Sequence, residues 1–119
     1  MRALLVALAG AAGALARYGI GLAVGMRSFP WGTLAINLTG SFILAGLLTA
    51  ATLHSWSPDA VTPIAVGFLG AYTTFSTFSY ETWTMLRTDR VATAGIYVGV
   101  SVIGGLCAAG AGYAVGRAV

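Results

Sequence analysis

Hydroxyl-bearing and aromatic side chains crowd one segment of this 119-residue chain, Gly70 to Ser79. Every residue of that segment after the first two is tyrosine, threonine, phenylalanine or serine. Together with its flanks, Thr62 to Leu69 and Tyr80 to Leu86, the segment predicts a membrane-spanning helix. Contact with lipid alone does not favour so many polar groups at that depth. The segment is therefore a candidate lining for a polar pathway.

The chemistry that this lining offers is hydrogen-bond donation. A proton relay favours carboxylates or histidines, and a cation path favours acidic side chains or carbonyls. No Asp, Glu, His or Lys lies between positions 60 and 80, so these side chains indicate neither kind of path. The rings of Phe75 and Phe78 have positive edges, and hydroxyls and amides donate O–H and N–H groups. Two rings three residues apart also fit simple core packing, but the many hydroxyls favour a path for a small, strongly hydrated anion.

Two other apolar runs carry polar residues on one helix face. Thr33, Asn37 and Ser41 are spaced four apart, and Tyr97 and Ser101 repeat that spacing near the end of the chain. A helical hydroxyl can donate to the carbonyl one turn earlier, which is a purely local role. An amide is not satisfied so locally, so Asn37 is expected to serve the pathway or to bridge two helices.

The composition shows which elements must position these residues. With 58% hydrophobic and 8% charged residues, the chain is predicted to lie within a membrane. Four apolar runs are long enough to cross a bilayer: Ala3–Met26, Trp31–Leu53, Pro63–Leu86 and Val91–Val115. We expect an all-α membrane protein whose four transmembrane helices form a single domain over residues 1–119. The short connections leave no room for a soluble domain, so neither enzyme activity nor a nucleic-acid partner is expected.

Two features of the chain also have simpler interpretations. Arg2, the following apolar run and Ala14-Leu15-Ala16 resemble a signal peptide, but the helical pattern continues past that site, so we expect the first span to be retained. The single cysteine, Cys107, cannot form an intrachain disulfide and is expected to pack among apolar neighbours.

The charges are nearly balanced across the predicted membrane. If the spans alternate in direction, one side carries two arginines, Arg2 and Arg117, and the other carries three, Arg27, Arg87 and Arg90. Since orientation follows this bias in short loops, a difference of one favours insertion in both directions. Two antiparallel copies would form a dimer with its axis in the membrane plane. Close helix packing is supported by the glycine pairs Gly21/Gly25, Gly95/Gly99 and Gly112/Gly116.

The third span is predicted to be broken near mid-membrane. Gly67, Gly70 and the pair Thr73-Thr74 weaken helix continuity, and irregular backbone is tolerated at that depth only when it is buried or lines a cavity. A break frees carbonyl oxygens, which are hard ligands suited to a small cation. Two antiparallel copies that meet at the break would supply a symmetric set of such ligands.

Three segments resemble the Fluc (CrcB) family of fluoride channels: Gly10 to Tyr18, Gly32 to Phe42 and Gly67 to Ser79. The third is the most specific, and the resemblance extends over all four spans. It implies an antiparallel, dual-topology dimer with two fluoride pores and a structural sodium ion at its centre. The implied activity is the passive export of fluoride across the cell membrane, by a homodimer or with a sister subunit, in contact with membrane lipid.

The resemblance also implies roles for individual residues. Phe75 and Phe78 correspond to pore-lining phenylalanines, Asn37 to an asparagine at the pore mouth, and Gly70 and Thr73 to residues whose carbonyls hold sodium. The remaining implied pathway residues are a polar track of Tyr97, Ser101, Thr33, Ser76 and Thr77, the vestibule acid Glu81, and the basic residue Arg17 of the first span. Gly105 stands where the track would have one more hydroxyl.

Two other classes of protein share some of these features. A small multidrug/proton antiporter also has four spans and dual topology, but it needs a carboxylate in the first span, where this chain has only Arg17. A non-conducting accessory subunit would account for the glycines but not for the polar stripes. It would tolerate any substitution of similar volume at Phe75 and Asn37.

Overall fold

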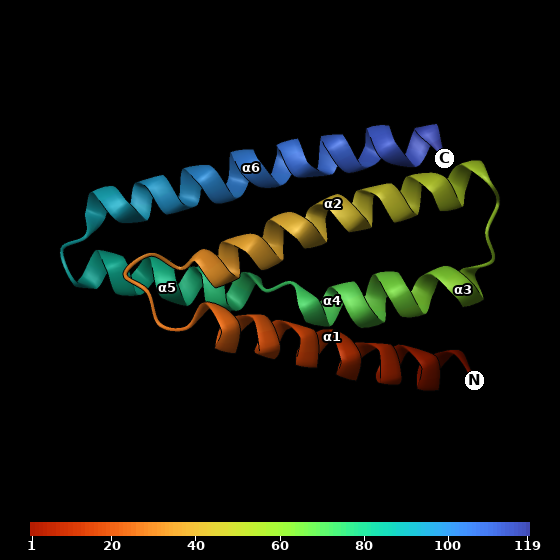
Figure 1. The fold of residues 1–119 in the computed structure, drawn as a ribbon, viewed down its shortest axis with the longest axis horizontal. Helices are drawn as coiled ribbons and strands as arrows, with labels where there is room; N and C mark the ends of the chain where they lie inside the picture. Colours follow the sequence, from red (N-terminus) through yellow and green to blue (C-terminus); the bar gives the residue numbers. More distant parts are fainter.

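The computed structural model describes all 119 residues, and every regular element in it is helical. Its helices are α1 (Arg2–Val24), α2 (Trp31–Leu53), α3 (Pro58–Thr62), η1 (Pro63–Leu69), α4 (Gly70–Tyr72), α5 (Phe75–Arg87) and α6 (Val91–Ala118). The chain runs back and forth along its longest dimension, as Figure 1 shows. This confirms the prediction of an all-α protein.

The predicted break in the third crossing lies at Thr73 and Thr74. Both residues are extended, with φ/ψ of −81°/159° and −151°/118°, and they separate α4 from α5. Before the break, Pro63–Leu69 form π-helical turns, which the sequence did not predict. The helix also begins at Pro58, earlier than the predicted Pro63, because proline is well suited to the first turn of a helix.

The other crossings match the apolar runs closely. Trp31–Leu53 is one helix with the predicted bounds, whereas the first crossing stops at Val24 because Gly25 adopts a left-handed backbone conformation (φ 67°). Three helices (α1, α2 and α6) are long and apolar enough to span a membrane without interruption. The broken helix supplies a further crossing that is not continuous, and the chain is a multi-pass membrane protein.

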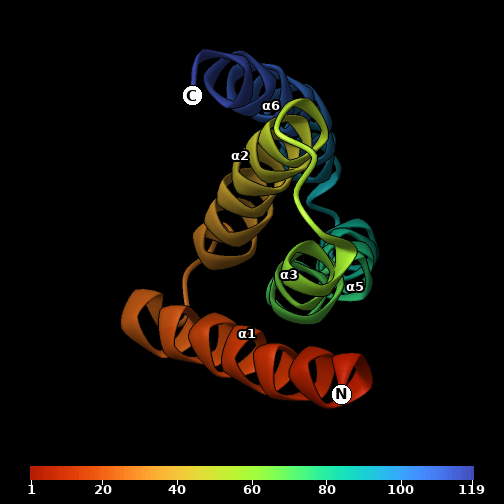
Figure 2. The same ribbon diagram turned by 90° about the vertical axis from the view of Figure 1, so that its right-hand side faces the viewer.

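The helices form two pairs joined by the broken crossing. α2 packs along α6, while α1 packs against η1 and α4, as Figures 1 and 2 show. α5 turns toward α6, so the two parts of the third crossing have different neighbours. The break therefore lies where the chain passes from one pair to the other.

Bare backbone at glycines allows both pairs to pack closely. A Cβ at Gly13 would overlap the carbonyl of Phe68, and a Cβ at Gly112 would overlap that of Phe42. Of the glycine pairs predicted to pack, Gly112/Gly116 do so within this chain. The other two pairs, Gly21/Gly25 and Gly95/Gly99, face open space in this chain. The sequence did not distinguish them, because periodicity alone does not show which helix face a neighbour covers.

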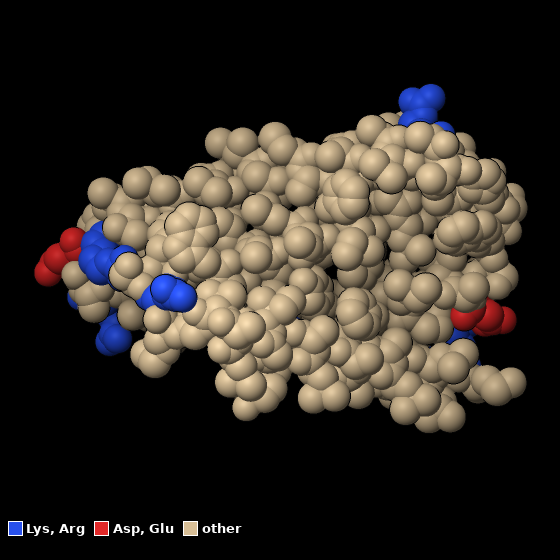
Figure 3. Space-filling model, in the orientation of Figure 1, with Lys and Arg blue, Asp and Glu red and all other residues tan.

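Charged and apolar side chains occupy separate parts of the surface. In Figure 3 the acidic and basic groups on the visible face gather at the two ends of the molecule, with an uncharged band between them. Only 17 of the 119 residues are buried, so most apolar side chains face outward. The long outer surface is therefore suited to lipid or to another protein chain.

Candidate functional site

Asn37 of α2 holds the break in the third crossing. Its Nδ2 donates to the carbonyl of Thr74 at 3.0 Å, and its Oδ1 accepts from the amide of the same residue at 2.8 Å. The side chain thus pairs with one extended residue as a neighbouring β-strand would. The expected bridge between helices is present, and one N–H of the amide remains free to serve an ion.

Thr74 also begins the helix that follows. Its Oγ1 accepts from the amide of Thr77 at 3.2 Å, donates to the hydroxyl of Thr77 at 3.1 Å and lies 3.3 Å from that of Ser76. Threonine is a favoured residue at this capping position. The sequence placed Thr74 at the break but did not predict this capping role, although a threonine three residues before another polar residue is a recognisable start of a helix. The cap brings Ser76 and Thr77 together at the break.

The break deprives the carbonyls of residues 70–73, those of Gly70 and Thr73 among them, of their usual helical partners. In a continuous helix the amide of Thr74 would donate to Gly70 and the amide of Thr77 would donate to Thr73. Here these amides donate to Asn37 Oδ1 and to Thr74 Oγ1 instead. The carbonyls of Gly70 and Thr73 are the two that were predicted to bind sodium, and their chemistry fits a small cation.

Three aromatic rings form a chain that leads away from the break. The centroids of Phe75 and Phe78 lie 5.9 Å apart, and those of Phe78 and Tyr97 lie 5.1 Å apart. Phe75 is 79% exposed, whereas Tyr97 is fully buried. The sequence-predicted rings are therefore adjacent, and one end of their chain opens to the surroundings of this single copy.

Glu81 lies beyond the rings and binds two predicted track residues. Thr33 donates to its Oε1 at 2.9 Å, and Tyr97 donates to its Oε2 at 2.7 Å. These bonds join α2, α5 and α6 at one carboxylate. The grouping was not predicted from the sequence, because the partners are 48 and 16 residues away and only the tertiary fold brings them together.

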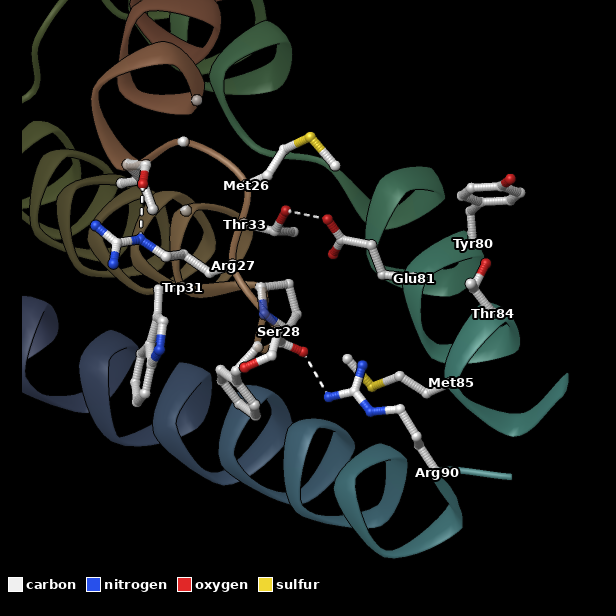
Figure 4. A pocket seen from close by; sticks show the side chains of 16 residues that line it. Met26, Arg27, Ser28, Trp31, Thr33, Tyr80, Glu81, Thr84, Met85 and Arg90 are labelled. Carbon is white, nitrogen blue, oxygen red and sulfur yellow. Dashed lines mark hydrogen bonds between the residues drawn. The ribbon is translucent and has the colours of Figure 1, made fainter. Parts of the chain in front are cut away.

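The carboxylate borders a hollow of about 420 Å³ at the end of the molecule where α1 meets α2. Figure 4 shows Glu81 pointing across it toward Thr33, and Arg90 donating to the carbonyl of Ser28. In the same segment, Arg27 donates to the carbonyl of Val24 at 3.1 Å. The hollow thus connects Glu81 with a basic end of the protein.

Arg17 lies apart from the rings. It borders a second hollow, of about 310 Å³, which is also lined by Thr33, Thr74 and Thr77. No carboxylate pairs with it, since the one ion pair of the chain joins Arg2 and Asp59. Arg17, the predicted basic residue, therefore shares a hollow with the break residue Thr74, and no carboxylate compensates its charge.

Ser101 has a buried hydroxyl without a hydrogen-bond partner. The same is true of Thr84, which the sequence did not single out. Most other hydroxyls in these helices donate to the carbonyl one turn earlier, as Ser41 does to Asn37 at 2.7 Å. Ser101 is thus free to donate elsewhere.

A third hollow, of about 250 Å³, is lined by Asn37, Thr73 and Phe75 among others.

Comparison with known proteins gives consistent matches over nearly the whole chain. Residues 4–113 match the family described as "CrcB-like protein, Camphor Resistance (CrcB)". The "Fluoride-specific ion channel FluC 2" of Geobacillus kaustophilus is 45% identical over 93% of this chain and 89% of its own length. The "Fluoride-specific ion channel FluC" of Acidobacterium capsulatum is 45% identical over 100% of this chain and 98% of its own. The "Fluoride-specific ion channel FluC" of Hahella chejuensis is 46% identical over 96% of this chain and 93% of its own length.

Proposed function

The chain belongs to the CrcB-like protein family, and from that premise we propose that it is a fluoride-selective channel through which cytoplasmic fluoride leaves the cell by passive diffusion. The observation that carries the proposal is the row of rings Phe75, Phe78 and Tyr97 between the Asn37-bound break and Glu81. It offers ring edges and neutral donors along one line. The relatives are named as ion channels, which supports a transport role rather than an enzymatic one.

Selectivity for fluoride follows from the cost of dehydration. A small anion loses its water shell only where donors replace it, and phenyl edges and hydroxyl or amide hydrogens can do so. Asn37 retains one N–H for this purpose, and the unpaired hydroxyl of Ser101 offers another donor. The proposed lining consists of Phe75, Phe78, Asn37, Ser101, Ser76 and Thr77. Thr33 and Tyr97 complete it with their hydroxyls bonded to Glu81, and Glu81 and Arg17 act on the local charge.

The channel is proposed to work as an antiparallel dimer, either of two identical chains or with a sister subunit. Three features support pairing: the small number of buried residues, the exposure of Phe75 and the near balance of arginines at the two ends. A pathway that is open to one side in a single copy would be closed by a second. The exposed ring of Phe75 would then contribute to an enclosed lining.

A structural sodium ion is proposed at the dimer centre, held by the carbonyls of Gly70 and Thr73 from each copy. The support is the diversion of their usual amide donors to Asn37 and to the Thr74 hydroxyl. A bound cation would supply positive charge between these oxygens. Sodium should therefore raise the thermal midpoint of unfolding above that measured in N-methylglucamine at equal ionic strength, and equal midpoints would contradict the site.

The direct test of the function is ion efflux from liposomes that contain the purified chain alone. Vesicles are loaded with potassium fluoride or potassium chloride, and efflux is started with valinomycin. We expect rapid release of fluoride without release of chloride. Equal release of both ions would contradict fluoride selectivity, and no release from folded protein would contradict conduction by the chain alone.

A further inference from the structure

A hollow between the far ends of α2 and α6 is not used by the proposed pathway. It has a volume of about 610 Å³ and is lined by Leu48, Thr49, Thr52, Leu53, Tyr113 and Arg117. Apolar side chains thus form part of its wall, and a single cation lies at one end. The hollow is at the opposite end of α6 from Val91, where the helix begins near the Glu81 cluster.

The donors in this hollow are concentrated on α6. The hydroxyls of Thr49 and Thr52 donate to carbonyls of their own helix, Ala45 at 2.7 Å and Leu48 at 2.8 Å. The hydroxyl of Tyr113 and the guanidinium of Arg117 make no hydrogen bond within the chain. Any polar ligand would therefore be bound mainly by these two groups.

Arg117 lies over the ring of Tyr113, and no acidic side chain compensates its charge. Its guanidinium carbon lies 5.8 Å from the centroid of the Tyr113 ring, a distance at which a cation and an aromatic face attract. Asp59 is the acidic side chain on this side of the membrane, and it is already paired with Arg2. The pair of donors thus presents net positive charge at a helix end, next to an apolar wall.

We propose that this hollow binds an anionic phospholipid, with the phosphate on Arg117 and Tyr113 and an acyl chain along Leu48 and Leu53. Charge complementarity selects this ligand, because a planar guanidinium pairs with phosphate oxygens and the apolar wall requires a hydrocarbon tail. The chain spans a membrane, so such a lipid is available where the helix ends. The site is independent of fluoride conduction.

Native mass spectrometry of the full-length purified chain tests the site. Bound phosphatidylglycerol is counted in titrations of wild type, Arg117→Gln, Tyr113→Phe and the control Arg87→Gln. Arg87→Gln makes the same change in charge as Arg117→Gln. Arg87 is exposed, makes no hydrogen bond and lies at the other end of the molecule, so its replacement does not touch the hollow. All variants are first checked for helical content and for a single peak in size-exclusion chromatography.

We expect Arg117→Gln to weaken phosphatidylglycerol binding about fivefold, the size of the attraction of one surface arginine to anionic lipid. Tyr113→Phe should weaken it less, Arg87→Gln should leave it unchanged, and phosphatidylcholine should bind more weakly to wild type. Equal losses for Arg117→Gln and Arg87→Gln would overturn the site, because they would indicate general attraction to charge. Competition by inorganic phosphate at millimolar concentration would overturn the choice of a lipid.

A second copy of the chain could instead cover this hollow. In that case Arg117→Gln would shift the equilibrium between monomer and dimer in analytical ultracentrifugation and leave lipid binding unchanged. That result would also overturn the proposal. An unchanged dimer with reduced phosphatidylglycerol binding supports it.

Discussion

The two parts of the broken third crossing differ in what they contact and how. The part before the break (Pro58 to Tyr72) packs against α1 with backbone close to backbone, as at Gly13. The part after it, α5, presents polar side chains to α2 and α6, and Glu81 receives bonds from both. One part acts as scaffold, and the other carries the donors. Under the proposed function, this single membrane crossing would divide packing and conduction between its two parts.

The largest effect is expected where the scaffold part meets α1. In Gly13→Ala the new methyl group would overlap the carbonyl of Phe68, and backbone cannot move aside as a side chain can. We expect a loss of about 3 kcal/mol in stability, the upper end for overpacking a tight contact. The measurement is the thermal midpoint of unfolding in detergent.

The matched control is Gly19→Ala on the same helix, where a methyl group meets no atom within 4 Å. It makes the same chemical change and should leave the midpoint nearly unchanged. If both variants lose equal stability, the close approach at Gly13 does not hold the scaffold part in place.

The next largest effect is expected at the junction of the two parts. Asn37→Ala leaves the amide and the carbonyl of Thr74 without partners, which should cost about 2 kcal/mol. Fluoride efflux should also fall, because the break would lose its geometry. Ser41→Ala is the control on the same helix face, since its hydroxyl donates only to the carbonyl of Asn37. Equal behaviour of the two variants would contradict a special role for the amide.

A smaller effect is expected within the donor-bearing part. Tyr97→Phe removes the bond to Glu81 but keeps the ring against Phe78, so it should cost about 1.5 kcal/mol and slow fluoride efflux. Tyr113→Phe removes a hydroxyl from the same helix that has no partner within the chain, and it should change neither the stability in lipid-free detergent nor the fluoride efflux. A Tyr97→Phe variant with full stability and full efflux would mean that the bond to Glu81 is unimportant.

The sequence predicted the crossings because apolar length and turn chemistry are local properties. Trp31–Leu53 was predicted with its exact bounds, and the pair Thr73-Thr74 indicated the break. The π-helical turns from Pro63 were missed, since an apolar run predicts the length of a crossing but does not distinguish π-helical from α-helical turns.

The sequence named the candidate site residues one by one but did not indicate how they assemble. Phe75 and Phe78 were paired correctly because their spacing is helical. The three-way contact of Glu81 with Thr33 and Tyr97 was missed, because it joins three separate helices. A bridging role was among those predicted for Asn37, but its partner, the extended residue Thr74, was missed, since that pairing requires the break to face α2 at that level.

The central claim is that fluoride passes along the donor-bearing part and not along the scaffold part. The most direct test compares fluoride efflux from liposomes for wild type, Phe75→Ile and Phe68→Ile. Phe68 provides the matched control, since its ring lies before the break and stacks on Tyr72 at 5.8 Å. We predict that Phe75→Ile slows efflux about tenfold or more, a barrier increase of about 1.4 kcal/mol, while folded Phe68→Ile conducts near the wild-type rate. Equal slowing by both substitutions, or full efflux through Phe75→Ile, would contradict the claim.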